Sequence, residues 1–171
     1  IENNKAENGG GIFCTQFEAN NGSDGSVVIN GGTIKNNTAT TGAGGGIYYD
    51  DGSTSESVAV TMNGGSIIEN KAATEGGGVY IGNQFVMNGG VLNNNTAAKA
   101  GDDIVYAPSG SNNRRSLKLM DISEKKWLLK EPQGTITGWF LDAETNRWNM
   151  TDAEELENLS YNEYKTVYLK A

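Results

Sequence analysis

The sequence predicts an all-β protein, a parallel β-helix solenoid of about three to four coils that ends in a small C-terminal α+β cap. Three observations predict this fold. One pattern of residues recurs nearly four times between residues 1 and 106. Each copy contains three short β-rich stretches separated by glycine clusters, which is the signal of strands and turns. No apolar stripe at helical spacing runs through these residues.

The motifs of the repeat follow one another in a fixed order. An apolar-x-Met-Asn-Gly-Gly segment is followed by an aliphatic residue, then by Asn-x-Ala, then by three glycines and an aliphatic-aromatic pair; residues 60–81 are the cleanest copy. Gly31 and Gly64 lie 33 positions apart, whereas Gly64 and Gly89 lie 25 apart. Almost all of this difference falls after the aliphatic-aromatic pair. A solenoid behaves in this way, because insertions become loops on one side of the coils.

Alternation along the strands predicts which side chains fill the core. The first strand of each coil is expected to point inward with Val27, Ile29, Val60, Met62, Phe85 and Met87. A second inward stack is expected from Ile1, Ile34, Ile67 and Leu92. The third strand is expected to point inward with Ile12, Ile47, Val79 and Ile104.

Four asparagines recur three residues after the second inward stack: Asn4, Asn37, Asn70 and Asn95. This spacing breaks the alternation of a strand, so we expect each asparagine to lie at a corner of its coil. Stacked amide side chains bond to the neighbours above and below, as they do in the asparagine ladders of stacked strands. The sequence therefore predicts a buried or half-buried structural ladder.

Two polar insertions interrupt the coils, residues 15–26 and 50–59, and both are expected to be surface loops. Residues 107–115 have no pattern and predict a connection. Residues 116–171 lose the repeat and gain tryptophan and charge, which predicts a cap over the apolar end of the solenoid or a small β-rich module with one short helix.

Within this C-terminal segment, strands are expected at residues 117–122, 127–129, 135–141 and 164–169. A short helix is expected to begin at Thr151 or Asp152 and to run to Leu159, because acidic residues fill its first turn. The aromatic residues of the segment leave a carbohydrate-binding module open as an alternative; these residues are Trp139, Phe140, Trp148 and Tyr161.

Composition excludes some functions. The net charge is −8 and there is no histidine, whereas nucleic-acid binding normally requires a basic face. The sequence contains no run of about 18 apolar residues, so it does not predict a segment that inserts into a membrane. The single cysteine, Cys14, aligns with inward positions and is expected to be a small buried hydrophobe. The chain begins inside a coil, so we expect a fragment of a longer protein, with any signal peptide or anchor outside it.

The repeat resembles the right-handed parallel β-helix regions, pectin-lyase-like in fold, of bacterial cell-surface and cell-wall-anchored adhesin-like proteins. The resemblance covers residues 1–106 and depends on Met-Asn-Gly-Gly, Asn-x-Ala and Gly-Gly-Gly-aliphatic-aromatic in that order. The segments 138–140 and 146–148 resemble regions that follow such helices. The resemblance implies a secreted or bacterial surface location and an adhesin or stalk role, and it implies no catalytic residues.

A polysaccharide-binding or polysaccharide-cleaving β-helix, lyase-like or hydrolase-like, is the alternative. Glycoside hydrolysis needs convergent carboxylates. The adjacent pairs Asp50-Asp51 and Asp102-Asp103 are not dyads by themselves, because neighbours on a strand point to opposite faces. The hydrolases of this fold carry a Gly-His-Gly motif, and this chain has no histidine. We therefore expect a non-enzymatic fragment that serves adhesion or ligand display.

The candidate ligand-binding residues lie on one outward column. Phe13, Tyr48 and Tyr80, followed by Val105, alternate with the inward residues of the third strand. This column either stabilises the sheet by cross-strand stacking or binds a host glycan or an extracellular protein. Asp50 and Asp51 directly follow Tyr49 in the sequence and are candidate ligand-binding residues as well. No cofactor is expected, although the acidic loops leave calcium open, and the sequence does not predict an oligomeric state.

Overall fold

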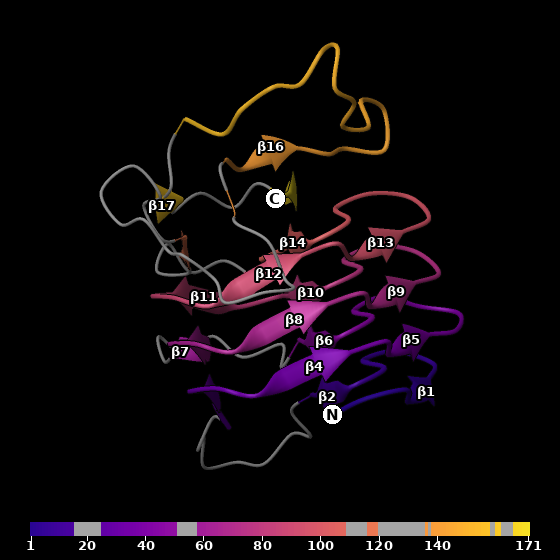
Figure 1. Ribbon diagram of the computed structural model, residues 1–171, viewed down its shortest axis with the longest axis vertical. Coiled ribbons are helices and arrows are strands. Elements are labelled where there is room, and N and C mark those ends of the chain that lie inside the picture. Colours follow the sequence, from indigo (N-terminus) through magenta and orange to yellow (C-terminus); the bar gives the residue numbers. More distant parts are fainter. Residues whose placement is uncertain are drawn as a thin grey trace.

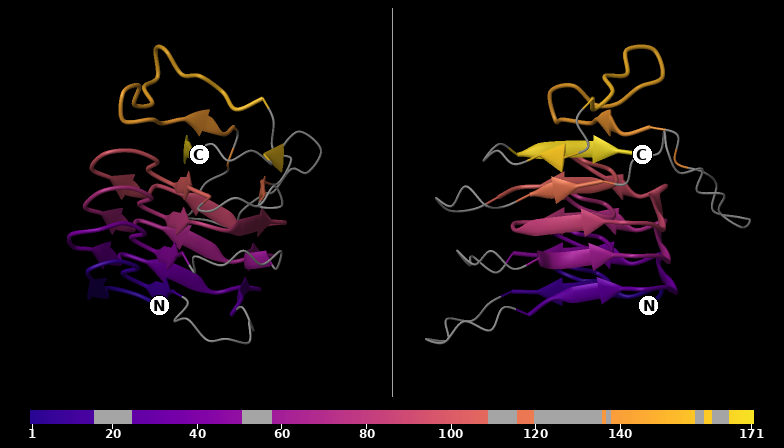
Figure 2. Two further views of the ribbon diagram at one scale, coloured as in Figure 1. Left: turned by 180° about the vertical axis from the view of Figure 1, so that it is seen from behind. Right: turned by 90° about the vertical axis from the view of Figure 1, so that its left-hand side faces the viewer.

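The computed structural model describes residues 1–15, 25–50, 58–108, 116–119, 136, 138–157, 160–161 and 166–171. In this part of the chain 18 strands form four sheets and there is no helix, so the all-β class is confirmed. The strands lie in layers stacked along the long axis of the molecule, as Figures 1 and 2 show. The N-terminus lies at one end of the stack and the residues after 138 lie at the other.

Each sheet collects one strand from successive repeats. The four-stranded sheet contains β1 (Lys5–Ala6), β5 (Thr38–Ala39), β9 (Lys71–Ala72) and β13 (Thr96–Ala97). The three-stranded sheet contains β4 (Thr33–Lys35), β8 (Ser66–Ile68) and β12 (Val91–Asn93). The five-stranded sheet contains β3 (Val27–Ile29), β7 (Val58–Met62), β11 (Gln84–Met87), β15 (Leu117–Lys118) and β17 (Ser160–Tyr161). The six-stranded sheet contains β2 (Ile12–Cys14), β6 (Ile47–Tyr49), β10 (Val79–Ile81), β14 (Ile104–Tyr106), β18 (Val167–Lys170) and β16 (Phe140–Leu141).

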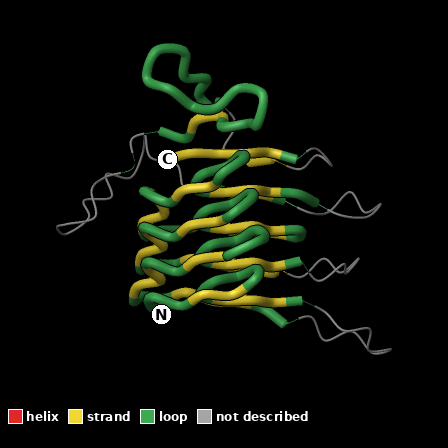
Figure 3. The backbone as a smooth tube through the Cα atoms, turned by 90° about the vertical axis from the view of Figure 1, so that its right-hand side faces the viewer, coloured by secondary structure: helices red, strands yellow, loops and turns green. Residues whose placement is uncertain are grey.

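The strands of successive repeats pair in parallel, and equivalent positions of the repeat lie side by side. Val79 of β10, for example, pairs with Ile47 of β6 on one side and with Ile104 of β14 on the other. Each repeat contributes four strands rather than the three expected. The additional strand is the two-residue segment that follows each ladder asparagine, which is too short to be recognised by alternation (Figure 3).

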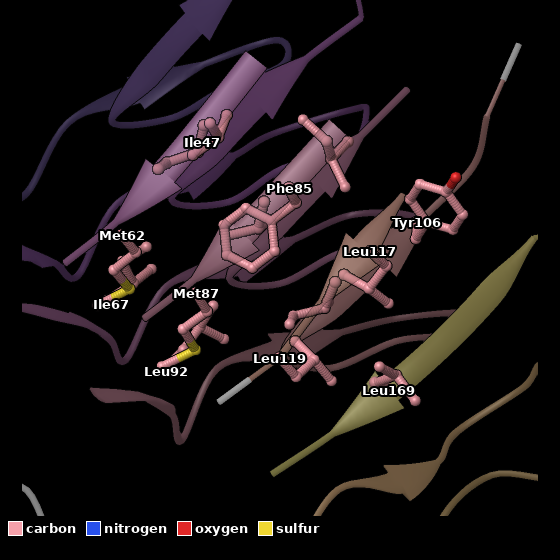
Figure 4. Close-up of a cluster of buried hydrophobic side chains, with 14 of the residues drawn as sticks. Ile47, Met62, Ile67, Phe85, Met87, Leu92, Tyr106, Leu117, Leu119 and Leu169 are labelled. Carbon is pink, nitrogen blue, oxygen red and sulfur yellow. The ribbon is translucent and has the colours of Figure 1, made fainter. Parts of the chain in front are cut away.

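Most of the buried apolar side chains form one large core (Figure 4). Fully buried members include Ile47, Val60, Met62, Ile67, Val79, Phe85, Leu92 and Ile104. The inward direction expected for these residues is confirmed, and burying each side chain contributes about 1.5–3 kcal/mol. The expectation for Ile1 is wrong, because this side chain is 54% exposed. Ile1 lies in the coil at one end of the stack (Figure 1).

A left-handed backbone residue turns the chain at one corner of each coil. These residues are Asn3 (φ 60°), Asn36 (φ 54°), Glu69 (φ 55°) and Asn94 (φ 56°). Each stands directly before a ladder asparagine. Asparagine is tolerated in this conformation because its short side chain bonds locally, whereas most L-residues meet a steric cost there. The turn explains why the asparagine spacing breaks the strand alternation.

The C-terminal residues add antiparallel strands to the last coil. β18 pairs with β14, β16 pairs with β18, and β17 pairs with β15. Two of the sheets therefore continue past the parallel repeats with their strand direction reversed. This pairing occupies the edges of β14 and β15, which would otherwise present free backbone groups.

The prediction of a short helix that begins at Thr151 or Asp152 is wrong, because residues 151–157 contain no helical turn. The chain here runs beside β16 instead. The backbone N–H of Leu156 donates to the carbonyl oxygen of Trp139 at 2.7 Å. Pairing with an open strand edge outweighs the local capping signal, since propensity is a weak determinant beside tertiary contacts.

The expected strands of the C-terminal segment form in shortened versions. β15 covers Leu117–Lys118, β16 covers only Phe140–Leu141, and β18 begins at Val167. The strand expected at residues 127–129 lies outside the described residues.

Candidate functional site

The outward aromatic column, Phe13, Tyr48 and Tyr80, lies on one face of the six-stranded sheet. In-register pairing of β2, β6 and β10 brings the three rings together, one from each coil. The ring centroids of Phe13 and Tyr48 are 5.3 Å apart with 15° between the planes, and those of Tyr48 and Tyr80 are 5.0 Å apart with 5° between the planes. The ring spacing therefore follows the spacing of neighbouring strands.

Stacking decides which parts of the rings a ligand can reach. Tyr48 lies between two rings, so both of its faces are covered, and only its edge is open to a ligand. Phe13 stacks against Tyr48 and is 52% exposed. The column thus presents the exposed part of Phe13 and the edge of Tyr48. Parallel stacking also stabilises the sheet, by about 0.5–1.5 kcal/mol for each aromatic pair.

The column continues beyond Tyr80 into the cap. Val105 is the next outward residue and is fully buried, unlike the three aromatic residues. It pairs with Tyr168 of β18, so Tyr168 extends the same outward column. The sequence indicates that Tyr168 alternates with two apolar residues, but nothing in it shows that β18 pairs with β14.

The tyrosine hydroxyls of the column stay protonated at neutral pH. Burial raises the pKa of Tyr80 to about 12, and the neighbouring Tyr48, Asp50, Glu75 and Tyr168 act in the same direction. Burial, followed by the charge of Asp50, also raises the pKa of Tyr48. Burial is likewise the main cause of the raised pKa of Glu75. The column therefore combines neutral hydroxyl groups with carboxyl groups at its border.

Asp50 is half-buried at the end of β6, and its backbone N–H donates to the carbonyl oxygen of Cys14 at 3.1 Å. Its side chain lies against Gly82, because a Cβ atom at that glycine would come within 2.5 Å of the Asp50 Oδ1 atom. Its charge acts on both column tyrosines, so Asp50 lies near the expected ligand surface. Asp51, the other acidic candidate, lies outside the described residues.

The four ladder asparagines are hydrogen-bonded in series. The backbone N–H and the Nδ2 group of Asn37 both donate to Oδ1 of Asn70 at 3.0 Å. Asn4 donates to Asn37 in the same way, and Asn70 donates in the same way to Asn95. The amide oxygens of Asn37, Asn70 and Asn95 thus each accept two bonds from the preceding coil, which gives the ladder a direction.

The ladder ends at Asp103, a role that the sequence did not reveal. Asn95 donates its N–H and its Nδ2 group to Oδ1 of Asp103 at 3.1 and 2.9 Å, and Ala171 N–H donates to Oδ2 at 2.8 Å. The carboxyl group therefore takes the place of a further asparagine oxygen. Burial raises the pKa of Asp103 to about 7, although the hydrogen bonds from Ala171 and Asn95 and the charge of Lys170 oppose this rise.

Two acidic and two basic residues near Asp103 form a cluster that we call the cap cluster: Asp102, Asp142, Arg147 and Lys170. Arg147 Nη2 is 2.6 Å from Asp102 Oδ1, and Arg147 Nε is 2.8 Å from Asp142 Oδ1. Lys170 Nζ is 2.6 Å from Asp102 Oδ2. The cluster joins the last coil to the cap and pairs two acids with two bases.

Three of the C-terminal aromatic residues, Trp139, Phe140 and Trp148, contact other parts of the protein. Trp139 is only 1% exposed and belongs to the core. Lys170 Nζ lies over the Trp148 ring, 5.3 Å from its centroid, and Phe140 tilts against the same ring. In these contacts the rings of Phe140 and Trp148 pack against other residues of this protein.

Metal binding finds no support in the described residues, where no group of three His, Cys, Asp or Glu side chains could hold an ion. The expected calcium loops are residues 20–24 and 50–53; apart from Asp50, they lie outside the described part. Cys14 is half-buried and packs against the core.

No protein-family model, curated protein or solved structure matches this chain. In the residues that the structure describes, no helix has the length and apolar character needed to cross a membrane.

Proposed function

We propose that this chain is part of an extracellular bacterial surface protein whose repeats wind as a right-handed parallel β-helix, and that it serves adhesion or ligand display without catalysis. The β-helix is supported by four sheets that each gain one parallel strand per repeat. The surface location is supported by the resemblance of the repeat to those of bacterial wall-anchored proteins. A stacked scaffold of this kind holds outward side chains at a fixed spacing, which suits an extended binding surface.

The aromatic column carries the proposal. Three rings on one sheet face, bordered by the carboxyl groups of Asp50 and Glu75, form a partly exposed apolar stripe. Exposed apolar stripes with a polar border are typical of partner surfaces. A sugar ring or a protein partner would contact the exposed part of Phe13 and the edges of Tyr48 and Tyr80.

The alternative is a polysaccharide-binding or polysaccharide-cleaving β-helix. Cleavage needs a carboxyl group that is free to move a proton at a bound sugar. Asp102 and Asp142 converge, but Arg147 binds both, and Asp103 is buried beneath the cap. These contacts favour a structural role for the three acids, which is why the non-enzymatic function is proposed.

The test is a Tyr48→Ala/Tyr80→Ala double variant and a Phe13→Ala variant, measured for binding to a glycan array and to host cells. The matched control, Val28→Ala/Thr61→Ala, removes a pair of outward side chains from the five-stranded sheet. We expect the control to bind as the unchanged protein does.

The pattern of loss distinguishes the ligand classes. Loss of binding to the glycan array indicates a sugar ligand, and loss of binding to host cells alone indicates a protein partner. Full binding by both folded variants would exclude the column. A reducing-end assay on the same glycans tests catalysis, and release of new ends by the purified protein would replace the adhesion proposal with the enzyme alternative.

A further inference from the structure

A second surface lies on a different sheet from the aromatic column. A shallow groove with a volume of about 380 Å³ crosses β1, β5 and β9 of the four-stranded sheet. Its lining residues are Lys5, Thr38, Ala39, Thr40, Lys71 and Ala73. Figure 1 shows these strands stacked at one side of the molecule.

The in-register stacking of the repeats creates this groove. Lys5 pairs with Thr38, and Thr38 pairs with Lys71, so the three residues form one outward column. Two long side chains therefore flank a short one, and alanines line the rest of the hollow. The two lysines are attached two strand spacings apart, about 10 Å, and each is long enough to lean over Thr38.

Within the described part of the chain, the polar side-chain groups of this column have no partner. In the described residues, neither lysine forms an ion pair or a hydrogen bond, and the Thr38 hydroxyl forms none. No acidic residue lines the groove, although Glu7 follows β1 on the chain. The chain has a net charge of −8, whereas the two unpaired ammonium groups make the surface of this groove positively charged. An anionic ligand complements this surface.

The donor set distinguishes between anions. Planar carboxylates are held best by the two-pronged guanidinium of arginine, which is absent from the groove. Lysine ammonium groups act as compact point charges that approach an anion from separate directions. Two ammonium groups and one hydroxyl present donors on different sides, which matches the three free oxygens of a tetrahedral ester.

We propose that the groove over β1, β5 and β9 binds a sulfate ester carried by a linear polysaccharide. Lys5 and Lys71 each donate to one sulfate oxygen, and the Thr38 hydroxyl donates to the third. The polymer lies along the stacking direction of the strands. This assignment rests on the proposed function only in placing the chain outside the cell, where sulfated glycans occur, and it uses none of the aromatic residues.

The test measures binding of the full chain to dextran sulfate, with unsulfated dextran, polyphosphate, polygalacturonate and polyglutamate as comparison polymers. We expect dextran sulfate to bind most tightly and unsulfated dextran not to bind. The Lys5→Gln/Lys71→Gln variant should bind dextran sulfate about tenfold more weakly or worse, because two charge-assisted bonds are removed. Lys99→Gln/Lys118→Gln is the matched control, since it changes the net charge equally outside the groove.

A second variant tests the geometry rather than the charge. Lys5→Arg/Lys71→Arg keeps both positive charges and should move the preference toward polygalacturonate and polyglutamate. If the unchanged protein binds either carboxylate polymer as tightly as dextran sulfate, the sulfate assignment is wrong. Tighter binding of polyphosphate identifies a phosphate site and also overturns it. An equal loss in the Lys99→Gln/Lys118→Gln control indicates binding by net charge and removes the groove from consideration.

The two surfaces can fail separately. Tyr48→Ala/Tyr80→Ala leaves the groove intact and should bind dextran sulfate as the unchanged protein does. If the lysine variant binds dextran sulfate normally while the tyrosine variant loses its ligand, the groove is wrong and the aromatic column stands. The reverse pattern leaves the groove and removes the column.

Discussion

Replacing Asp103 by asparagine should abolish one component of the pH dependence of stability. The Asp103 carboxyl group is buried, and burial raises its pKa from 3.8 to about 7 in the folded protein. The folded protein therefore binds this proton more tightly than the unfolded chain does. Between these two pH values the folded state holds more protons, so the free energy of unfolding falls as the pH rises.

The size of this effect follows from the two pKa values. At about 1.4 kcal/mol for each pH unit, the difference corresponds to a loss of at most about 4 kcal/mol between pH 4 and pH 8. Asp103→Asn has no proton to lose at this position. It should therefore match the unchanged protein most closely near pH 4 and become the more stable of the two by pH 8.

Urea unfolding followed by tryptophan fluorescence measures this difference, because Trp139 is buried in the folded protein. Taking the difference between variant and unchanged protein at each pH cancels groups such as Glu75, whose pKa is also raised. Asp152→Asn, at an exposed acid of the cap, is the control for removing one carboxyl group. A stability difference for Asp103→Asn that is constant with pH, or that favours the aspartate more at pH 8, would refute the reasoning. The three hydrogen bonds to the carboxylate would then outweigh the cost of burying its charge.

Three further substitutions test the stack itself. Asn70→Ala should lower the free energy of unfolding by about 1–3 kcal/mol, since it leaves the two donors of Asn37 unsatisfied; an unchanged melting curve would contradict a structural ladder. Glu69→Asn should raise the melting temperature, with a gain of about 0.5–1 kcal/mol, because asparagine tolerates the left-handed corner better; a loss would show that the exposed contact with a lysine outweighs backbone strain. Gly45→Ala should lower the free energy of unfolding by more than about 3 kcal/mol, because its Cβ would lie 2.3 Å from a carbonyl oxygen of the next coil. At Gly31 an added Cβ meets open space, so the control Gly31→Ala should unfold at the same denaturant concentration as the unchanged protein.

The repeated part of the fold could be predicted because every coil faces the same physical constraints. Val60, Ile67 and Val79 recur at matched positions, and the structure pairs each with its counterparts in register. The fourth strand of each coil was missed because two residues are too few for alternation to be visible. Tertiary stacking, rather than local propensity, makes Lys71–Ala72 a strand.

The cap could not be predicted to the same extent because each of its contacts occurs once. The segment after residue 151 has acidic residues suited to the first turn of a helix, yet it lies along β16. Tyr168 joins the aromatic column only because β18 pairs with β14. A non-repeating segment provides no second copy against which a register can be checked, so its pairing partners are not visible in the sequence.

The glycine triplet connects these two parts of the molecule. Inside the stack, side chains are forbidden at its second and third positions, because a Cβ at Gly45 or Gly46 would lie 2.3 or 2.6 Å from a backbone oxygen of the following coil. The last triplet has Asp102 and Asp103 at these two positions, and the strand that pairs with β14 on the cap side is the antiparallel β18. Asp103 accepts the bonds that the next ladder asparagine would accept, and Asp102 binds the cap through Arg147. The change from glycine to aspartate therefore marks the transition from the parallel repeats to the cap. Inside the stack the neighbouring backbone excludes a side chain at these positions. In the last coil the aspartate side chains occupy the same positions and accept hydrogen bonds from donors that would otherwise be free.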